Sequence, residues 1–251
     1  MKICRISHLS QEYWGILLEG NIHRLIGDLY DSPGVGEKIC SLDEAVFLPP
    51  LQNINKVPAI AANYGEKDER DGPGIFMKQP GTYLEHGGQI IYPRGCKTVI
   101  HEAELGIVIG KKARHVEEVN ALQYVLGYTC VNDVSGREMK ESDQGKGLSM
   151  RWKHFDTFCP MGPFIETNVE SPMDLDIECF VNGELSVSGN TSGMIFSVPK
   201  LISWVSEVMT LYPGDIIPTG CPGVAEINVG DVIEVKIESI GSLVNSVIAD
   251  Y

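Results

Sequence analysis

Long apolar runs and paired cysteines are absent from this sequence of 251 residues. No stretch of 18 consecutive apolar residues occurs, so we expect no membrane-spanning helix. The seven cysteines are scattered singly, without any Cys-x-x-Cys pair. This spacing argues against a zinc site or a disulfide framework and indicates buried thiols in a reducing compartment. A nucleophilic role stays open for Cys159 or Cys221.

Positive charge is also scarce, since 20 Lys+Arg against 34 Asp+Glu give a net charge of −14. A nucleic-acid partner is disfavoured, because such proteins present a basic face. The first residues contain neither a sustained apolar segment nor a small-residue cleavage site, so we expect a cytoplasmic protein. Hydrophobic residues at 43% and charged residues at 22% are ordinary for a folded enzyme and argue against disorder.

Short strands separated by turns dominate the pattern. Residues 1–52 are interpreted as a small β-rich N-terminal module, and residues 53–251 as a larger catalytic domain. Asn182-Gly183 between apolar runs predicts a hairpin. Apolar residues at helical spacing after Ser197 predict a helix to about residue 209, and a further helix is expected around residues 117–125. The fold class indicated is α+β, mostly β.

Two carboxylates alternate along a predicted strand, at Glu102 and Glu104. Alternate side chains of a strand point to one face, roughly 7 Å apart, and His101 then points away. Neighbouring carboxylates repel unless a cation lies between them. Oxygen ligands favour Mg²⁺ or Mn²⁺ over zinc, and Asp133 at the end of the next strand could supply a third. The plain alternative is a solvated strand face.

The order of motifs over residues 56–247 resembles the fumarylacetoacetate hydrolase (FAH) superfamily. The matching segments are Asn63-Tyr64, Phe76-Met77-Lys78, Glu102-Ala103-Glu104-Leu105, Gly127-Tyr128, residues 132–137, residues 153–160, Val181-Asn182-Gly183-Glu184, residues 211–215 and Thr219-Gly220-Cys221-Pro222. The resemblance implies a mixed β-sandwich roll, usually assembled as a homodimer.

The resemblance also implies roles for particular residues. Mg²⁺ or Mn²⁺ would be held by Glu102, Glu104 and Asp133. Lys153 would face the substrate oxyanion. The expected substrate-binding residues are Tyr64, Arg137, Lys140, Thr219 and Gly220.

The sequence departs from the family pattern at the mouth of the implied site. Hydrolases of the family carry a His and a Glu, in Asn-Tyr-x-x-His-x-x-Glu, that activate water. Lys67 and Arg70 stand at those positions here, with Glu69 one residue away. Lys140 replaces a frequent Gln, and Cys221 replaces the second Thr of Thr-Gly-Thr-Pro.

Loss of the histidine favours chemistry that needs an electron sink rather than activated water. We therefore predict isomerisation or decarboxylation of a small 2-oxo or enol diacid through a metal-bound enolate. Such an isomerase acts on 2-hydroxyhepta-2,4-diene-1,7-dioate in the catabolism of aromatic compounds. Glu69 or Lys67 would move the proton.

Two alternatives stay open at this stage. A lid base supplied by Glu66 or His86 would restore C–C hydrolysis of an acylpyruvate or a fumarylacetoacetate-like substrate. A non-catalytic homologue that binds a metal or ligand is the second alternative.

Overall fold

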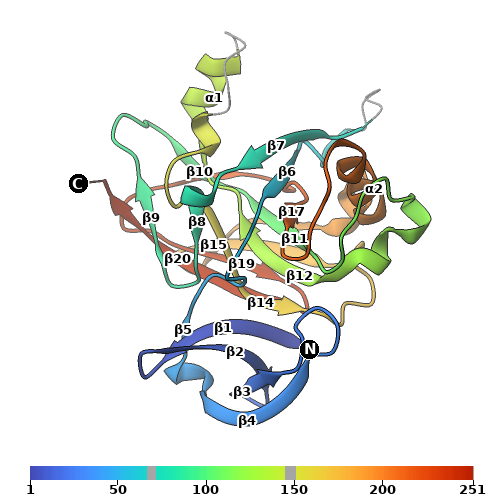
Figure 1. Cartoon of the computed structure of the whole chain (residues 1–251). Coiled ribbons are helices and arrows are strands. Elements are labelled where there is room, and N and C mark those ends of the chain that lie inside the picture. The colour runs from blue at the N-terminus through green and yellow to red at the C-terminus, as the bar shows by residue number, and fades with distance from the viewer. Residues whose placement is uncertain (67–71, 145–150, 251) are drawn as a thin grey trace.

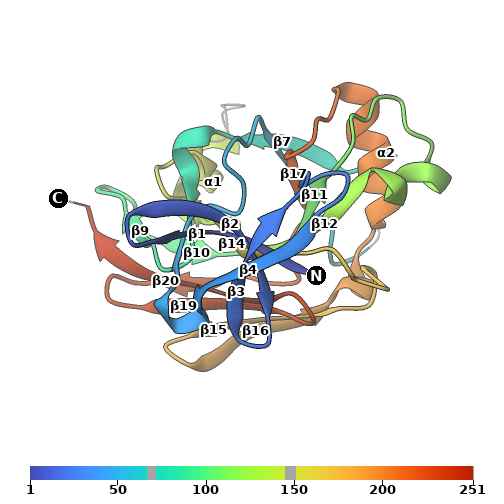
Figure 2. The same ribbon diagram turned by 60° about the horizontal axis from the view of Figure 1, so that its bottom comes forward.

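The structure is a computed structural model that describes residues 1–66, 72–144 and 151–250. Strands make up 47% of it and helices 16%. The predicted α+β class, mostly β, is therefore confirmed. The N-terminal strands lie on one side of the molecule, and α1 and β7 lie on the opposite side (Figures 1 and 2).

The largest sheet joins the N-terminal strands to the strands that carry the carboxylate motifs. Its order is β17 (Ile216–Pro218), β11 (Ala103–Ile109), β12 (Val125–Asn132), β14 (Cys159–Glu166), β1 (Lys2–His8), β2 (Gln11–Leu18), β3 (Asn21–Ile26) and β4 (Gly34–Ser41), with β5 (Val46–Phe47) on β1 and β8 (Tyr83–Leu84) on β14. Antiparallel pairing of β1 with β14 makes the N-terminal segment part of this sheet. The division at residue 52 stays a prediction.

Three smaller sheets complete the β structure. The first contains, in order, β16 (Glu184–Asn190), β15 (Asp176–Val181), β19 (Val232–Ile237), β20 (Gly241–Ala249) and β9 (Gln89–Tyr92). The second contains β13 (Ser135–Gly136), β10 (Val99–His101) and β18 (Ala225–Ile227). The third pairs β6 (Val57–Ala61) with β7 (Gly74–Lys78). The predicted hairpin joins β15 to β16. Asn182 and Gly183 have φ of 54° and 82° there, the left-handed values that a two-residue hairpin turn needs.

Helices are few and short. The described ones are α1 (Arg137–Gln144), α2 (Val198–Val208) and the 3₁₀ turns η1 (Leu42–Glu44), η2 (Pro80–Thr82), η3 (Glu118–Tyr124), η4 (Arg151–Lys153) and η5 (Thr191–Gly193). The prediction of α2 is confirmed: the Ser197 side chain accepts a hydrogen bond from the Lys200 N–H. The helix expected around residues 117–125 is the 3₁₀ turn η3. None of the described helices is long and apolar enough to cross a membrane.

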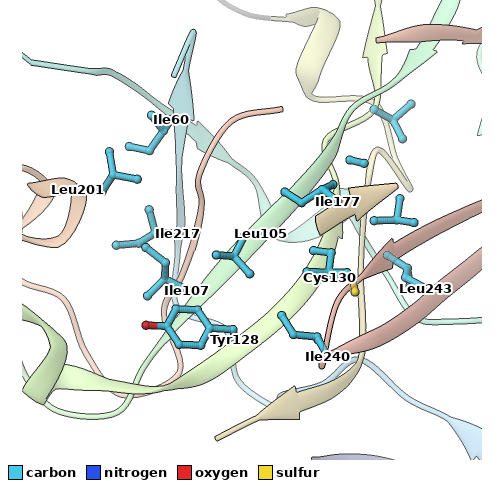
Figure 3. Packing of buried hydrophobic residues seen from close by; sticks show 14 of the residues in the cluster. Ile60, Leu105, Ile107, Tyr128, Cys130, Ile177, Leu201, Ile217, Ile240 and Leu243 are labelled. Atoms are coloured by element: carbon cyan, nitrogen blue, oxygen red, sulfur yellow. The ribbon is translucent and has the colours of Figure 1, made fainter. Parts of the chain in front are cut away.

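The strand that carries Glu104 is buried on both faces. Leu105 and Ile107 of β11 belong to the main core, which packs β11 and β12 against the sheet of β15, β19 and β20 and extends to residues of β6, α2 and β17 (Figure 3). Val108 belongs to a second cluster, which includes residues of β1, β14 and β17. A Cβ on Gly106 would lie 2.7 Å from Val131 Cγ2, so glycine permits this close packing. Packing from both sides fixes β11 and the carboxylate on it.

Candidate active site

A pocket of about 500 Å³ brings together most of the residues predicted for the site. The charged and polar ones among its lining residues are Glu102, Glu104, Asp133, Lys153, Arg137, Lys140, Tyr64 and the Gly220 backbone. Ile60, Phe76, Ile100, Trp152 and Val224 supply apolar walls. Predicted residues from distant parts of the chain therefore share one cavity that is charged at its base and partly apolar at its sides.

Glu102 lies between two strands rather than inside one, which corrects the expected continuous strand. β10 ends at His101 and pairs with β13 and β18, whereas β11 begins at Ala103 and pairs with β12 and β17. The Glu102 N–H donates to Asn132 Oδ1 at 3.0 Å, and the Asp133 N–H donates to the Glu102 carbonyl at 2.9 Å. These hydrogen bonds hold Glu102 to the segment of Asn132 and Asp133, at the point where the chain passes from β10 in one sheet to β11 in another.

The three carboxylates at the base of the pocket meet two buried lysines. Lys153 Nζ lies 2.8 Å from Glu102 Oε1 and also contacts Asp133 Oδ2. Lys78 Nζ lies 2.8 Å from Asp133 Oδ1. The Glu104 side chain has no ion pair among the described residues, and its Oε2 accepts the Gly220 N–H at 2.8 Å. The sequence reasoning assigned no role to Lys78, because a lysine ending a short strand resembles any surface lysine.

Burial and charge act on these groups in opposite directions. Burial raises the pKa of the Glu104 carboxyl well above its ordinary value, and the Asp133 charge adds to this. Burial would also raise the pKa of Asp133, but the Lys153 and Lys78 ammonium groups lower it below its ordinary value. Burial lowers the pKa of Lys153, yet the three carboxylates raise it overall. Among the described residues, Glu104 is therefore the one of the three carboxylates without an ion pair, which fits a site for a divalent ion.

The donor atoms also fit a divalent ion. One carboxylate oxygen each of Glu102 and Glu104 and the Cys221 sulfur lie within 4.8 Å of one another. Both carboxylate oxygens of Asp133 contact lysines. Carboxylate oxygens are the ligands that Mg²⁺ and Mn²⁺ prefer. The assignment of Asp133 as the third ligand stays a prediction.

The mouth of the pocket carries charges from one face of α1. Arg137, Lys140 and Glu141 all line the pocket, as their spacing on a helix allows. The Arg137 side chain is about half exposed and lies 3.9 Å from Glu226, which is still more exposed. Two cations and one carboxylate of α1 therefore lie at the exposed side of the pocket.

Two predicted residues, Tyr64 and Thr219, and the neighbouring Asn63 line or adjoin the pocket in different ways. The Tyr64 hydroxyl is buried and has no hydrogen-bond partner among the described residues, and burial raises its pKa. Thr219 is fully buried and is not among the residues that line the pocket. Asn63, to which the sequence reasoning gave no role, donates to the carbonyls of Phe196 and Thr219 at 3.1 and 2.9 Å and accepts the Phe196 N–H.

The residues predicted as proton carriers or as substitute lid bases do not meet in the pocket among the described residues. Lys67 and Glu69 lie outside the described residues. His86 lies in a second pocket, where its Nδ1 accepts the Val244 N–H at 3.1 Å and its ring packs edge-on against Phe47. Glu66 does not line the pocket that holds the three carboxylates either. Neither residue proposed as a substitute lid base therefore reaches the site.

Burial affects the two candidate thiols and His101. Burial raises the pKa of Cys159 to about 12, and burial together with Glu102 and Glu104 raises the pKa of Cys221 further. A raised pKa disfavours the thiolate form in the metal-free protein, which argues against a cysteine nucleophile. His101 is fully buried and points away from the carboxylates, with Nε2 3.1 Å from Ser186 Oγ.

Comparison with known families identifies the chain. Residues 51–248 match the family described as fumarylacetoacetate (FAA) hydrolase C-terminal, and residues 1–50 match the family described as Rv2993c-like, N-terminal. The chain therefore belongs to the FAA hydrolase family.

Relatives within this family have several activities. The chain is 37% identical to human mitochondrial oxaloacetate tautomerase FAHD2A, over 82% of this chain and 70% of that protein. It is also 37% identical to the 2,4-didehydro-3-deoxy-L-rhamnonate hydrolase of a Sphingomonas species, over 96% and 94% of the two chains.

Solved structures agree with the fold. The 2-hydroxyhepta-2,4-diene-1,7-dioate isomerase of Mycobacterium marinum superposes with a TM-score of 0.91 at 35% identity, over 100% of this chain and 99% of that one. The maleylpyruvate hydrolase of Sphingobium, solved with manganese(II) and pyruvate, superposes with a TM-score of 0.85 at 26% identity, over the full length of both chains.

Proposed function

We propose that this protein is a divalent-metal-dependent enzyme that acts on a small 2-oxo or enol diacid by enolate chemistry, as an isomerase (including keto–enol tautomerisation) or a decarboxylase. The observation that carries the proposal is the buried set of three carboxylates and two lysines at the base of a pocket with cations at its mouth. Glu102, Glu104 and Asp133 are the proposed metal ligands. A bound Mg²⁺ or Mn²⁺ would supply Lewis-acid stabilisation of negative charge on the 2-oxo oxygen.

The remaining residues of the site divide the work of binding and charge stabilisation. Lys153 is fixed by Glu102 and Asp133 and keeps its positive charge, so it stabilises an oxyanion without reorganising. Arg137 and Lys140 attract the distal carboxylate at the mouth. The apolar walls around Phe76 and Trp152 lower the local dielectric constant and strengthen these interactions. Lys67 or Glu69 is the proposed proton carrier.

The alternative of C–C hydrolysis has less support. Hydrolysis needs a general base within reach of a water molecule. The described residues that line the pocket include no histidine, and His86 lies in another pocket. Enolate chemistry needs positive charge near the developing oxyanion, and Lys153 together with the proposed divalent ion would supply it.

A proton-NMR time course with oxaloacetate and Mg²⁺ tests the proposal. Wild-type protein should produce pyruvate, or should speed keto–enol exchange, beyond a control containing Mg²⁺ alone. Glu104→Ala should lose the effect, and Glu170→Ala, a change at an exposed residue, should keep it. Pyruvate would identify decarboxylation, whereas faster exchange alone would identify tautomerisation.

If the wild-type protein neither forms pyruvate nor speeds keto–enol exchange, the result contradicts the proposal for oxaloacetate. The same assay with 2-hydroxyhepta-2,4-diene-1,7-dioate and with an acylpyruvate then separates the alternatives. Cleavage of the acylpyruvate would establish hydrolysis. If none of the three substrates is converted but metal binding is measurable, the results favour a non-catalytic homologue.

A further inference from the structure

A thiol lies beside the two glutamates at the base of the pocket. Cys221 stands third in Thr219-Gly220-Cys221-Pro222, and its Sγ lies 3.6 Å from Glu102 Oε2. Glu102 and Cys221 are 119 positions apart in the chain, so the fold rather than local sequence brings them together. Among the described residues, the only group of three metal-ligating side chains found close together is Glu102, Glu104 and Cys221.

The loop that presents this thiol is fixed in place. Gly220 has φ of 90°, and its N–H donates to Glu104 Oε2 at 2.8 Å. A Cβ on Gly220 would lie 2.9 Å from the Asn63 Cβ, so glycine is needed for this close approach. On the other side of Cys221, Pro222 lies against Gly189 of β16. The sulfur therefore holds its position relative to the carboxylates.

Two of the proposed oxygen ligands also contact lysines, Glu102 through Lys153 and Asp133 through both lysines. Both carboxylate oxygens of Asp133 contact lysine ammonium groups, Oδ1 with Lys78 and Oδ2 with Lys153. Glu104 has no such ion pair among the described residues. The Cys221 sulfur lies within 4.8 Å of one oxygen each of Glu102 and Glu104, so it adds a donor beside the proposed oxygen ligands.

We infer that Cys221 supplies a sulfur ligand to the divalent ion held by Glu102 and Glu104, an inference that rests on the proposed metal-dependent function. Coordination forms the metal–sulfur bond as the S–H bond breaks, and the proton leaves to solvent. Sulfur is a softer donor than oxygen, so the site binds thiophilic ions such as Co²⁺, Zn²⁺ and Cd²⁺ more tightly than a threonine at this position would allow.

A cobalt titration tests the inference without measuring activity. Full-length metal-free protein is titrated with Co²⁺, and the near-ultraviolet sulfur-to-cobalt charge-transfer band is recorded. Wild type should show the band. Cys221→Thr, which restores the family residue, and Cys221→Ser should still bind Co²⁺ but lose the band. Cys159→Ala, a change at another buried thiol near the site, should keep it.

Calorimetric titration with Cd²⁺ and Mg²⁺ supplies a second readout. Cys221→Thr should weaken Cd²⁺ binding by about 10- to 100-fold and leave Mg²⁺ binding within about twofold. Circular dichroism at matched temperature checks that each variant is folded.

Two results would overturn the inference. One is cobalt binding by the wild type without a charge-transfer band, and the other is a band that survives in Cys221→Thr. Either result leaves the proposed metal-dependent function standing. Absence of divalent-metal binding in the wild type would instead reject the metal site itself, and the sulfur ligand with it.

Discussion

The base and the mouth of the pocket are built in different ways. At the base, Asp133 and Lys78 are almost completely buried, and their charged groups are joined by ion pairs. At the mouth, Arg137 and its partner Glu226 are 52% and 63% exposed and lie 3.9 Å apart. Solvent screens the charges at the mouth, whereas the base holds them in a low dielectric.

This difference separates two kinds of contribution. Changes at the base should alter the reaction and the fold together, because an unpaired buried charge is costly. Changes at the mouth should alter the choice of substrate and little else, because exposed ion pairs contribute little energy.

The largest expected effect comes from removing the cation at the base. Lys153→Met leaves Glu102 and Asp133 short of positive charge and removes the proposed oxyanion partner. We expect activity at saturating Mg²⁺ to fall about 10²- to 10³-fold. The free energy of unfolding should fall by about 3–5 kcal/mol. Lys236→Met, at an exposed lysine, is the matched control, and a loss of activity under tenfold would contradict the proposed role.

Acid should destabilise the protein through His101, which is buried and precedes Glu102 in the chain. Burial lowers its pKa to about 4, against about 6.5 in an unfolded chain. Between these values the unfolded state binds more protons, so stability increases with pH across the window and is lost as pH falls from 6.5 towards 4. The loss should reach about 3 kcal/mol at the acid end.

Urea unfolding at pH 7 and pH 4.5 measures this effect. His101→Gln should lose less stability between the two pH values than wild type does. His115→Gln, at an exposed histidine, should behave like wild type. Equal pH dependence in all three proteins would contradict the assignment of the effect to His101.

Asn63 connects the wall of the pocket to its base. Asn63→Leu leaves the Phe196 N–H and the Thr219 carbonyl without their side-chain partner. We expect a loss of about 1–3 kcal/mol in the free energy of unfolding, measured by urea titration. Asn120→Leu, at an exposed position, should change stability by less. A smaller effect for Asn63 than for Asn120 would show that this network contributes nothing to stability.

The smallest expected effect lies at the mouth. Lys140→Gln removes one exposed cation, worth about 0.2–1 kcal/mol, so KM for a diacid should increase about 1.5- to 5-fold. KM for the corresponding monoacid should not change, and kcat should stay the same for the diacid and the monoacid. Glu141→Gln should act in the opposite direction on the diacid. An equal effect of Lys140→Gln on both substrates would show that this lysine does not select for the distal carboxylate.

Local patterns predicted much of the fold and the composition of the pocket. The Asn182-Gly183 turn and α2 were readable because turn geometry and helix capping depend on neighbouring residues. The break in the strand at Glu102 was not readable, because the residues on either side of it pair with different sheets. The positions of Lys67 and Glu69 stay untested, since both lie outside the described residues.

The sequence by itself determined the family, the mostly β class and the motifs that carry the carboxylates. Only the tertiary structure decided which charges meet, because Lys78, Glu102 and Cys221 lie on separate segments that pairing between distant strands brings to one cavity. In the tertiary structure, Lys78 contacts Asp133, Cys221 lies beside Glu102, and His86 lines a different pocket. A sequence motif specifies which groups are present, whereas packing specifies the distances on which their electrostatic energies depend.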